Sequence, residues 1–161
     1  MTNEIVTDTR LQGSALSVRH LPIMLRAFFR QRALVVWHYG FSLLVVFLGC
    51  GLLVGANEEL LPLIACAVML LTLLSCGVFG TSRGLWAFFG GAGAERYRGS
   101  RHASGALIVF WVSRFLITLS VSLLQLLVLA VVYDVSLGRS PGALFVVLIL
   151  SSAVFVTLGF F

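Results

Sequence analysis

Few residues in this sequence have the type and spacing that chemistry requires. His20, His38 and His102 stand far apart, and none has a cysteine or carboxylate at metal-ligand spacing. The six acidic residues are too scattered along the chain to nominate a general acid and base pair. Because the chain contains no lysine, the usual phosphate-binding lysine of a nucleotide-binding loop is missing. We therefore predict no catalytic residue, no metal site, no cofactor held by this chain and no enzyme activity of its own.

Polar side chains inside the apolar segments are the next candidates for a site. A lipid-modifying enzyme would need several of them to converge, and the candidates are Thr72, Ser75, Ser120, Ser122, Gln125 and Thr157. These groups are weakly reactive, and an amide in a membrane helix often joins neighbouring helices by hydrogen bonds. We interpret Gln125 in that way rather than as a site residue. The three cysteines lie in apolar runs without metal-binding spacing, which favours a packing role.

Arg114 is the one charged residue within a long apolar run. An intramembrane charge suggests a functional site by default. If the helix enters the bilayer near Phe115, however, Arg114 lies at the headgroups and its side chain can extend toward them. We favour this membrane-boundary anchor, and the alternative is a buried ligand for a substrate or partner.

The composition explains why the polar residues are so few. Of the 161 residues, 60% are hydrophobic and only 11% are charged, whereas soluble domains average about 45–50% and about 25%. The mean hydropathy is +1.07. The lipid bilayer is therefore the expected solvent. The net charge of +5 comes from arginines at the ends of apolar runs, which is not the clustered basic patch that nucleic-acid binding requires.

Hydrophobic patterning predicts an all-α integral membrane protein with an amphipathic interfacial helix and about four transmembrane helices. Residues 1–17 form a cytoplasmic tail, and residues 18–32 form the interfacial helix. Arg19, Arg26 and Arg30 fall on one stripe of this helix, opposite an arc of apolar residues that would lie in the membrane interface. The alternative is that the apolar arc packs on a soluble partner.

The transmembrane domain is expected over residues 33–161. Its spans cover residues 33–55, 60–80, 106–133 and 143–161, and residues 81–105 form a long loop. Because most arginines lie in the amino-terminal region and this loop, both are predicted to be cytoplasmic in a multi-pass topology. Gly51 and Gly55 form a G-x-x-x-G pattern that would serve either a contact within the bundle or a dimer interface.

This order of elements resembles the amino-terminal part of the transmembrane domain of ABCG-type ABC transporters. The loop carries the resemblance, in Phe79-Gly80-Thr81-Ser82-Arg83, Glu95-Arg96, Arg101-His102-Ala103-Ser104-Gly105 and the aromatic run ending at Arg114. The family pattern has a loop of basic and acidic residues, a Ser-Gly step and an aromatic run ending in a basic residue. The likeness covers roughly His20 to Phe161, about the first four of six spans.

The resemblance implies the permease part of an exporter for lipid, sterol or another hydrophobic compound. A separate ATP-binding cassette domain or subunit, carrying the ATP and Mg, would supply the energy, and the chain would work as a homodimer or heterodimer. Glu95, Arg96, Arg98 and Arg101 would form the coupling loop that receives motion from that partner. The alternative function is a small stand-alone four-helix membrane scaffold or assembly protein without transport activity.

Overall fold

The computed structural model describes residues 21–54, 60–90, 103–134 and 141–161, and every regular element in these ranges is a helix. The first described helix covers residues 21–30. The others, in chain order, are α2 (Arg32–Val35), the π-helix η1 (Val36–Phe41), α3 (Ser42–Val54), α4 (Leu61–Thr72), the π-helix η3 (Leu73–Phe79), α5 (Gly80–Phe89), α7 (Ala103–Val132) and α8 (Pro141–Leu158).

Three helical segments are long and apolar enough to cross a membrane. They are Arg32–Leu52, Leu61–Ala87 and Gly105–Val132, with 21, 27 and 28 residues. At 1.5 Å per residue the shortest is about 32 Å long, which matches a hydrocarbon core about 30 Å thick. The prediction of an all-α protein whose helices are long and apolar enough to span a membrane is thus confirmed for these three segments. The apolar helix Gly142–Leu158 is shorter.

The second of these segments continues beyond the end expected from the sequence. We expected a loop from residue 81, but α5 remains helical through Phe89. Only residues 81–83 are polar before the apolar stretch Leu85-Trp86-Ala87 resumes, and three polar residues do not stop a helix that already exists. The helix ends at Gly90, whose backbone is extended.

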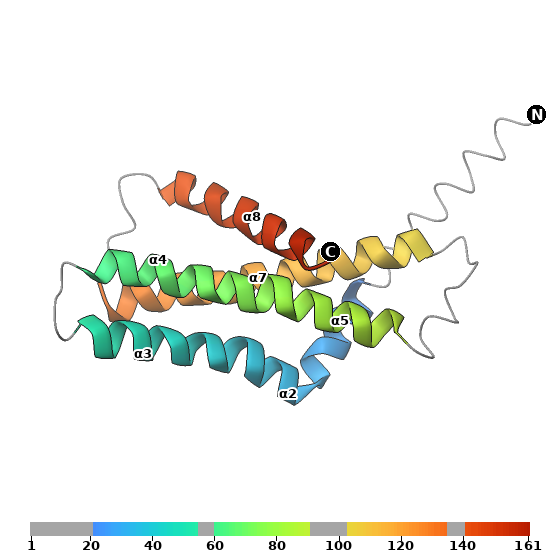
Figure 1. Cartoon of the computed structure of the whole chain (residues 1–161), viewed down its shortest axis with the longest axis horizontal. Helices are drawn as coiled ribbons and strands as arrows, with labels where there is room; N and C mark the ends of the chain where they lie inside the picture. The colour runs from blue at the N-terminus through green and yellow to red at the C-terminus, as the bar shows by residue number, and fades with distance from the viewer. Residues whose placement is uncertain (1–20, 55–59, 91–102, 135–140) are drawn as a thin grey trace, which may run out of the picture.

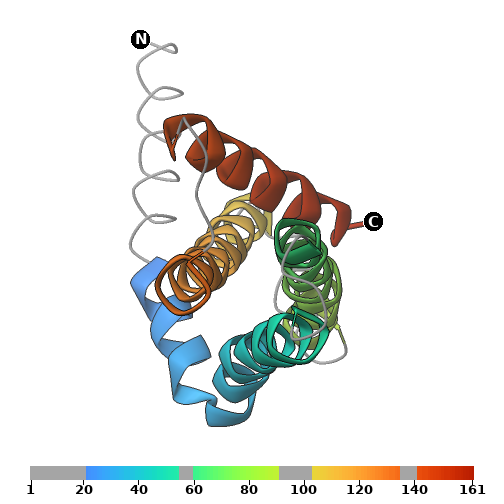
Figure 2. The same ribbon diagram turned by 90° about the vertical axis from the view of Figure 1, so that its left-hand side faces the viewer.

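The spans lie side by side in one bundle. Figure 1 shows α3, the α4–α5 segment and α7 running along the long axis, with α8 crossing them obliquely. The end-on view in Figure 2 shows α8 on one side of the bundle and α3 on the other. The main contacts of α8 are with η3 and α7, while α3 contacts α4 and α7. The helix of residues 21–30 ends at a break at Gln31, before α2 begins. Its axis is inclined to that of α3 (Figure 1).

Tight packing joins α3 to α4 and α7. Val46, Cys50, Ala65, Val68 and Leu129 form the buried core cluster. At Gly49, an added Cβ would lie only 2.7 Å from Val68 Cγ2, so the two helices approach as closely as a glycine permits.

A polar contact at the centre of the bundle joins three helices. The Nε2 group of Gln125 donates hydrogen bonds to the Ser42 carbonyl at 3.1 Å and to Thr72 Oγ1 at 2.6 Å. Gln125 has no exposed surface. Its predicted role in joining neighbouring helices is confirmed. The predicted packing role of the cysteines holds for Cys50 and Cys76, which are buried, whereas Cys66 is exposed.

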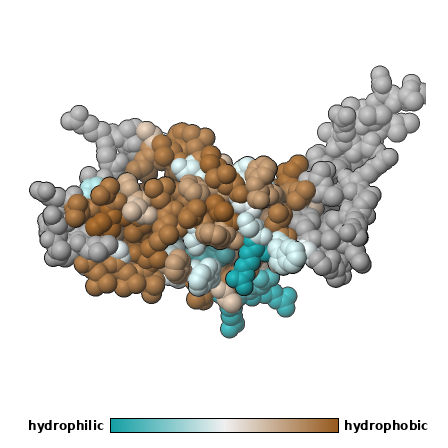
Figure 3. All heavy atoms as spheres, viewed as in Figure 1, coloured by the Kyte–Doolittle hydropathy of each residue, from teal (hydrophilic) through white to brown (hydrophobic). Residues whose placement is uncertain are grey.

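The outer face of the spans is apolar. In Figure 3 hydrophobic residues cover most of the bundle, and hydrophilic residues gather at the lower edge. The exposed polar residues of the described chain include Arg26, Arg30, Gln31 and Arg32. A surface this apolar fits contact with lipid chains rather than with water.

Candidate functional site

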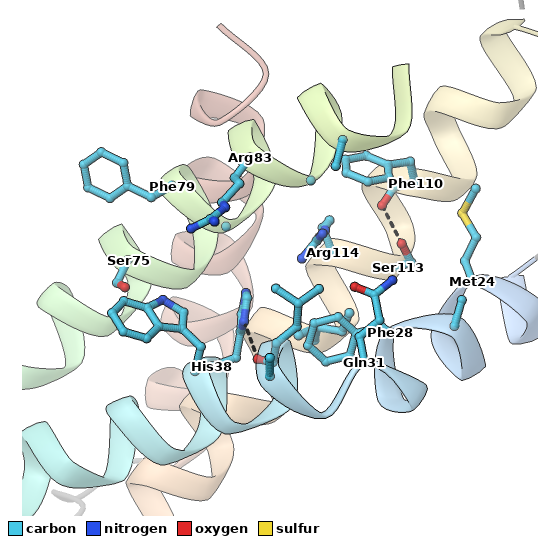
Figure 4. Close-up of a pocket in the computed structure, with 18 residues that line it drawn as sticks. Met24, Phe28, Gln31, His38, Ser75, Phe79, Arg83, Phe110, Ser113 and Arg114 are labelled. Carbon is cyan, nitrogen blue, oxygen red and sulfur yellow. Dashed lines mark hydrogen bonds between the residues drawn. The ribbon is translucent and has the colours of Figure 1, made fainter. Parts of the chain in front are cut away.

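The structure contains a cavity of about 690 Å³ (Figure 4). It lies between the helix of residues 21–30, the two π-helices, α5 and α7. The π-helix η1 contributes Trp37 and His38, and η3 contributes Ser75 and Phe79. Because π-helical turns are rare and occur frequently at functional sites, their presence on two walls supports this cavity as the candidate site.

Arg114 extends into this cavity from α7. Its guanidinium carbon lies 5.3 Å from the ring centroid of Phe110 and 5.7 Å from that of Phe28. Phe110 is one turn earlier on the same face of α7, and Phe28 comes from the helix of residues 21–30. Each such cation–π contact stabilises the charge by about 0.5–2 kcal/mol.

The burial of Arg114 differs from our expectation. We expected an anchor whose side chain reaches the headgroups, but only 9% of its surface is exposed. Its Nη1 atom is buried and has no hydrogen-bond partner. The helix of residues 21–30 covers this face of α7 through Phe28 and encloses the side chain in protein, while the position of Arg114 at the membrane boundary stays a prediction. The alternative of a buried ligand for a substrate or partner fits the observed position.

His38 forms a second polar point in the same cavity. Its Nδ1 group donates a hydrogen bond to the Leu34 carbonyl at 2.9 Å, because a carbonyl oxygen can only accept. Its Nε2 atom is buried without a partner. In the neutral ring, Nε2 is therefore a hydrogen-bond acceptor. The Phe28 ring packs edge-on against the imidazole, with centroids 5.2 Å apart.

Two glycines on α5 make room for these two side chains. An added Cβ at Gly80 would lie 2.7 Å from His38 Nε2. At Gly84, an added Cβ would overlap the Arg114 guanidinium. The two glycines are four residues apart and therefore share one face of the helix. This face of α5 carries no side chain at Gly80 and Gly84, and this bare face packs against the His38 imidazole and the Arg114 guanidinium.

The charge of the cavity lining is positive. Arg83 and Arg114 both line it, and its lining residues include no carboxylate. Figure 4 shows the side chains of Arg83, Arg114 and His38 around the same space. Because an unpaired buried charge is costly in a low-dielectric region, the arrangement favours an anionic group over a cation.

The structure places the other predicted site residues as follows. Arg26 and Arg30 are exposed on the helix of residues 21–30. The predicted apolar arc of this helix consists of Leu21, Met24, Leu25, Phe28 and Phe29. Met24 and Phe28 line the cavity, so part of this arc packs against the protein's own helices. Arg19 of the predicted interfacial helix lies outside the described ranges. So do the predicted coupling residues Glu95, Arg96, Arg98 and Arg101. Within the described ranges, no group of His, Cys, Asp and Glu residues could hold a metal ion.

Sequence reasoning missed two parts of this cavity. The Gly80-x-x-x-Gly84 spacing is the same signal that we noted at Gly51 and Gly55, and it could have marked the bare face of α5. The π-helical segments have no such signal, because their hydrophobic patterns do not differ from those of ordinary spans.

No protein-family model, curated protein or solved structure matches the chain. The cavity and the helices that surround it are therefore the features from which a function can be inferred.

Proposed function

We propose that this chain is the membrane-spanning part of an ABCG-type ABC transporter. It exports a lipid, sterol or other hydrophobic compound with energy from a separate ATP-binding domain. Residues 91–102 connect α5 to α7 and contain the charged residues expected to meet that partner. The apolar spans and the sparse polar groups between them suit a hydrophobic substrate better than an ion.

The observation that carries this proposal is the position of Phe28. Its ring contacts His38 of η1 and Arg114 of α7, so one residue of the helix 21–30 touches two spans. Packed side chains transmit displacements because protein interiors have low compressibility. A partner that pushes this helix therefore moves the first and third spans together. Rigid movement of helix groups is the common basis of alternating access in transporters.

The proposed topology has four spans with a cytoplasmic amino terminus. Besides the three long segments, the helix Gly142–Leu158 crosses the membrane. Its 17 residues extend about 26 Å, and a bilayer thins locally by a few Å at modest cost. The helix of residues 21–30 then lies at the cytoplasmic interface, with Arg26 and Arg30 toward the headgroups. Two such chains, identical or different, assemble as a dimer.

The test is purification of the tagged full chain from its native membrane in mild detergent, followed by mass spectrometry. We expect an ATP-binding cassette protein at near-stoichiometric yield. The double variant Glu95→Gln/Arg96→Gln should lose this protein and still insert into the membrane. The double variant Glu58→Gln/Arg139→Gln removes the same two charges from residues 55–59 and 135–140, the other two connections between helices, and should retain the cassette protein.

Two results would contradict the proposal. Recovery of the tagged chain with only copies of itself would favour the stand-alone scaffold. Unchanged recovery of the cassette protein with the Glu95→Gln/Arg96→Gln variant would remove the assigned role of the loop.

A further inference from the structure

We infer that the cavity binds the phosphate group of an anionic phospholipid from the neighbouring leaflet, with Arg114 as its main ligand. This inference does not depend on the ATP-binding partner, because every residue that carries it belongs to this chain. It rests on three features of the cavity: an unpaired buried cation, a rim that faces lipid, and a volume that suits a headgroup.

The first feature is the buried charge of Arg114. Only 9% of the side chain is exposed, and its Nη1 atom has no hydrogen-bond partner. The two aromatic rings lie near the guanidinium carbon, but they offer no oxygen or nitrogen acceptor for its N–H groups. A phosphate oxygen is the acceptor that best matches this planar group, since it brings the missing negative charge as well.

The second feature is the apolar rim. Trp37 and Phe79 line the cavity and are 56% and 65% exposed, although both lie within membrane-spanning segments. In a bilayer these exposed ring surfaces contact lipid chains. A molecule that leaves its acyl chains outside against these rings can place its headgroup inside. A small anion in water lacks this contact.

The third feature is the size and polarity of the interior. A volume of about 690 Å³ accommodates a headgroup and the first carbons of a lipid, but not two whole acyl chains. Arg83, which is exposed, adds a second positive charge at the lining. His38 Nε2 faces Gly80, one helical turn from the Arg114 position at Gly84, and can accept a hydrogen bond from a headgroup hydroxyl. Phosphatidylglycerol carries both a phosphate and hydroxyls, so it is the suitable probe.

The experiment is native mass spectrometry of the purified full chain in mild detergent with phosphatidylglycerol added. Phosphatidylcholine with the same acyl chains is the zwitterionic control, and glycerol phosphate is the headgroup without chains. We expect phosphatidylglycerol to bind with one tight site and phosphatidylcholine to bind more weakly. Arg114→Gln should weaken phosphatidylglycerol binding by about tenfold or more, as the loss of a charge-assisted hydrogen bond implies.

The matched control is Arg32→Gln. Arg32 is exposed and does not line the cavity. Because each substitution removes one arginine, Arg32→Gln has the same net charge as Arg114→Gln. It should keep the tight site. Equal loss in both variants would mean that only bulk charge attracts the lipid. Equal binding to wild type and Arg114→Gln, equal binding of phosphatidylcholine, or displacement by an equal concentration of glycerol phosphate would each overturn the inference.

A second measurement needs no variant and guards against a misfolded Arg114→Gln protein. The thermal unfolding midpoint of the wild-type chain should rise with phosphatidylglycerol and not with phosphatidylcholine, because a ligand of the folded state stabilises it by mass action. The same midpoint with both lipids would contradict the inference.

Discussion

The guanidinium of Arg114 lies over the ring of Phe28, with 5.7 Å between the guanidinium carbon and the ring centroid. This contact joins α7 to a residue 86 positions earlier in the chain (114 − 28). It buries the one charge of α7 and fixes the helix of residues 21–30 against the bundle. The contact therefore belongs both to the cavity and to the proposed path of coupling.

Removing the Phe28 ring should release the helix of residues 21–30. Because Phe28 is 6% exposed and contacts both His38 and Arg114, Phe28→Ala removes the main packing of this helix. Limited trypsin digestion in detergent should cleave after Arg26 and Arg30 about tenfold faster, since cleavage follows local opening. The matched control is Phe29→Ala, because the Phe29 ring is 53% exposed. Equal acceleration by both substitutions would show that Phe28 does not hold the helix.

A methyl group at Gly84 should displace Arg114. An added Cβ there overlaps the guanidinium, so Gly84→Ala should destabilise the protein by about 1–3 kcal/mol. In an Arg114→Ala background the clash is absent, and the same substitution should cost much less. Thermal unfolding of the four proteins in this double-mutant cycle measures the coupling. Additive effects would mean that Gly84 and Arg114 do not meet.

The crossing of α8 over η3 should depend on Gly159. An added Cβ at this position lies 2.7 Å from the Val78 carbonyl oxygen and 2.8 Å from that of Gly77. Gly159→Ala should therefore lower stability by about 1–3 kcal/mol. Gly142→Ala is the control, because nothing lies within 4 Å of its added Cβ. Thermal unfolding in detergent distinguishes the two, and an unchanged midpoint for Gly159→Ala would contradict the close crossing.

Replacing Gln125 by leucine should weaken the centre of the bundle. The substitution removes two interhelical hydrogen bonds, to the Ser42 carbonyl and Thr72 Oγ1, and should cost about 1 kcal/mol. Leu127→Ala on the same helix is the control, since Leu127 is 60% exposed. A midpoint for Gln125→Leu equal to or above that of the wild type would show that the hydrogen bonds add no net stability.

The sequence predicts the spans well because their signal is local. Twenty apolar residues in a row indicate a membrane helix whatever lies beside them, and the segments Arg32–Leu52, Leu61–Ala87 and Gly105–Val132 overlap the expected spans. The boundary at residue 81 was wrong because a single polar turn, residues 81–83, has the composition of a loop end and yet continues as helix. Gln125 was predictable since an amide in an apolar run needs a partner.

The cavity was not predictable from the same patterns because its parts come from distant segments. Arg114 lies near the start of an apolar run, where both an exposed anchor and a buried ligand are consistent with the sequence. Which occurs depends on Phe28, whose ring covers that face only after the chain breaks at Gln31. The contact between His38 and Gly80 likewise depends on the packing of two distant segments, the first and second spans.

The most direct test of the proposed function is ATP-driven lipid movement by the complex purified through the tagged chain. The complex is reconstituted in vesicles with a fluorescent phospholipid analogue, and its movement between leaflets is followed by chemical quenching. We predict that Mg-ATP raises the rate of movement several-fold over a non-hydrolysable analogue, and that the Glu95→Gln/Arg96→Gln variant, purified in the same way, shows no such increase. Equal rates with and without hydrolysable ATP, in a complex that contains an active ATPase, would contradict the assignment.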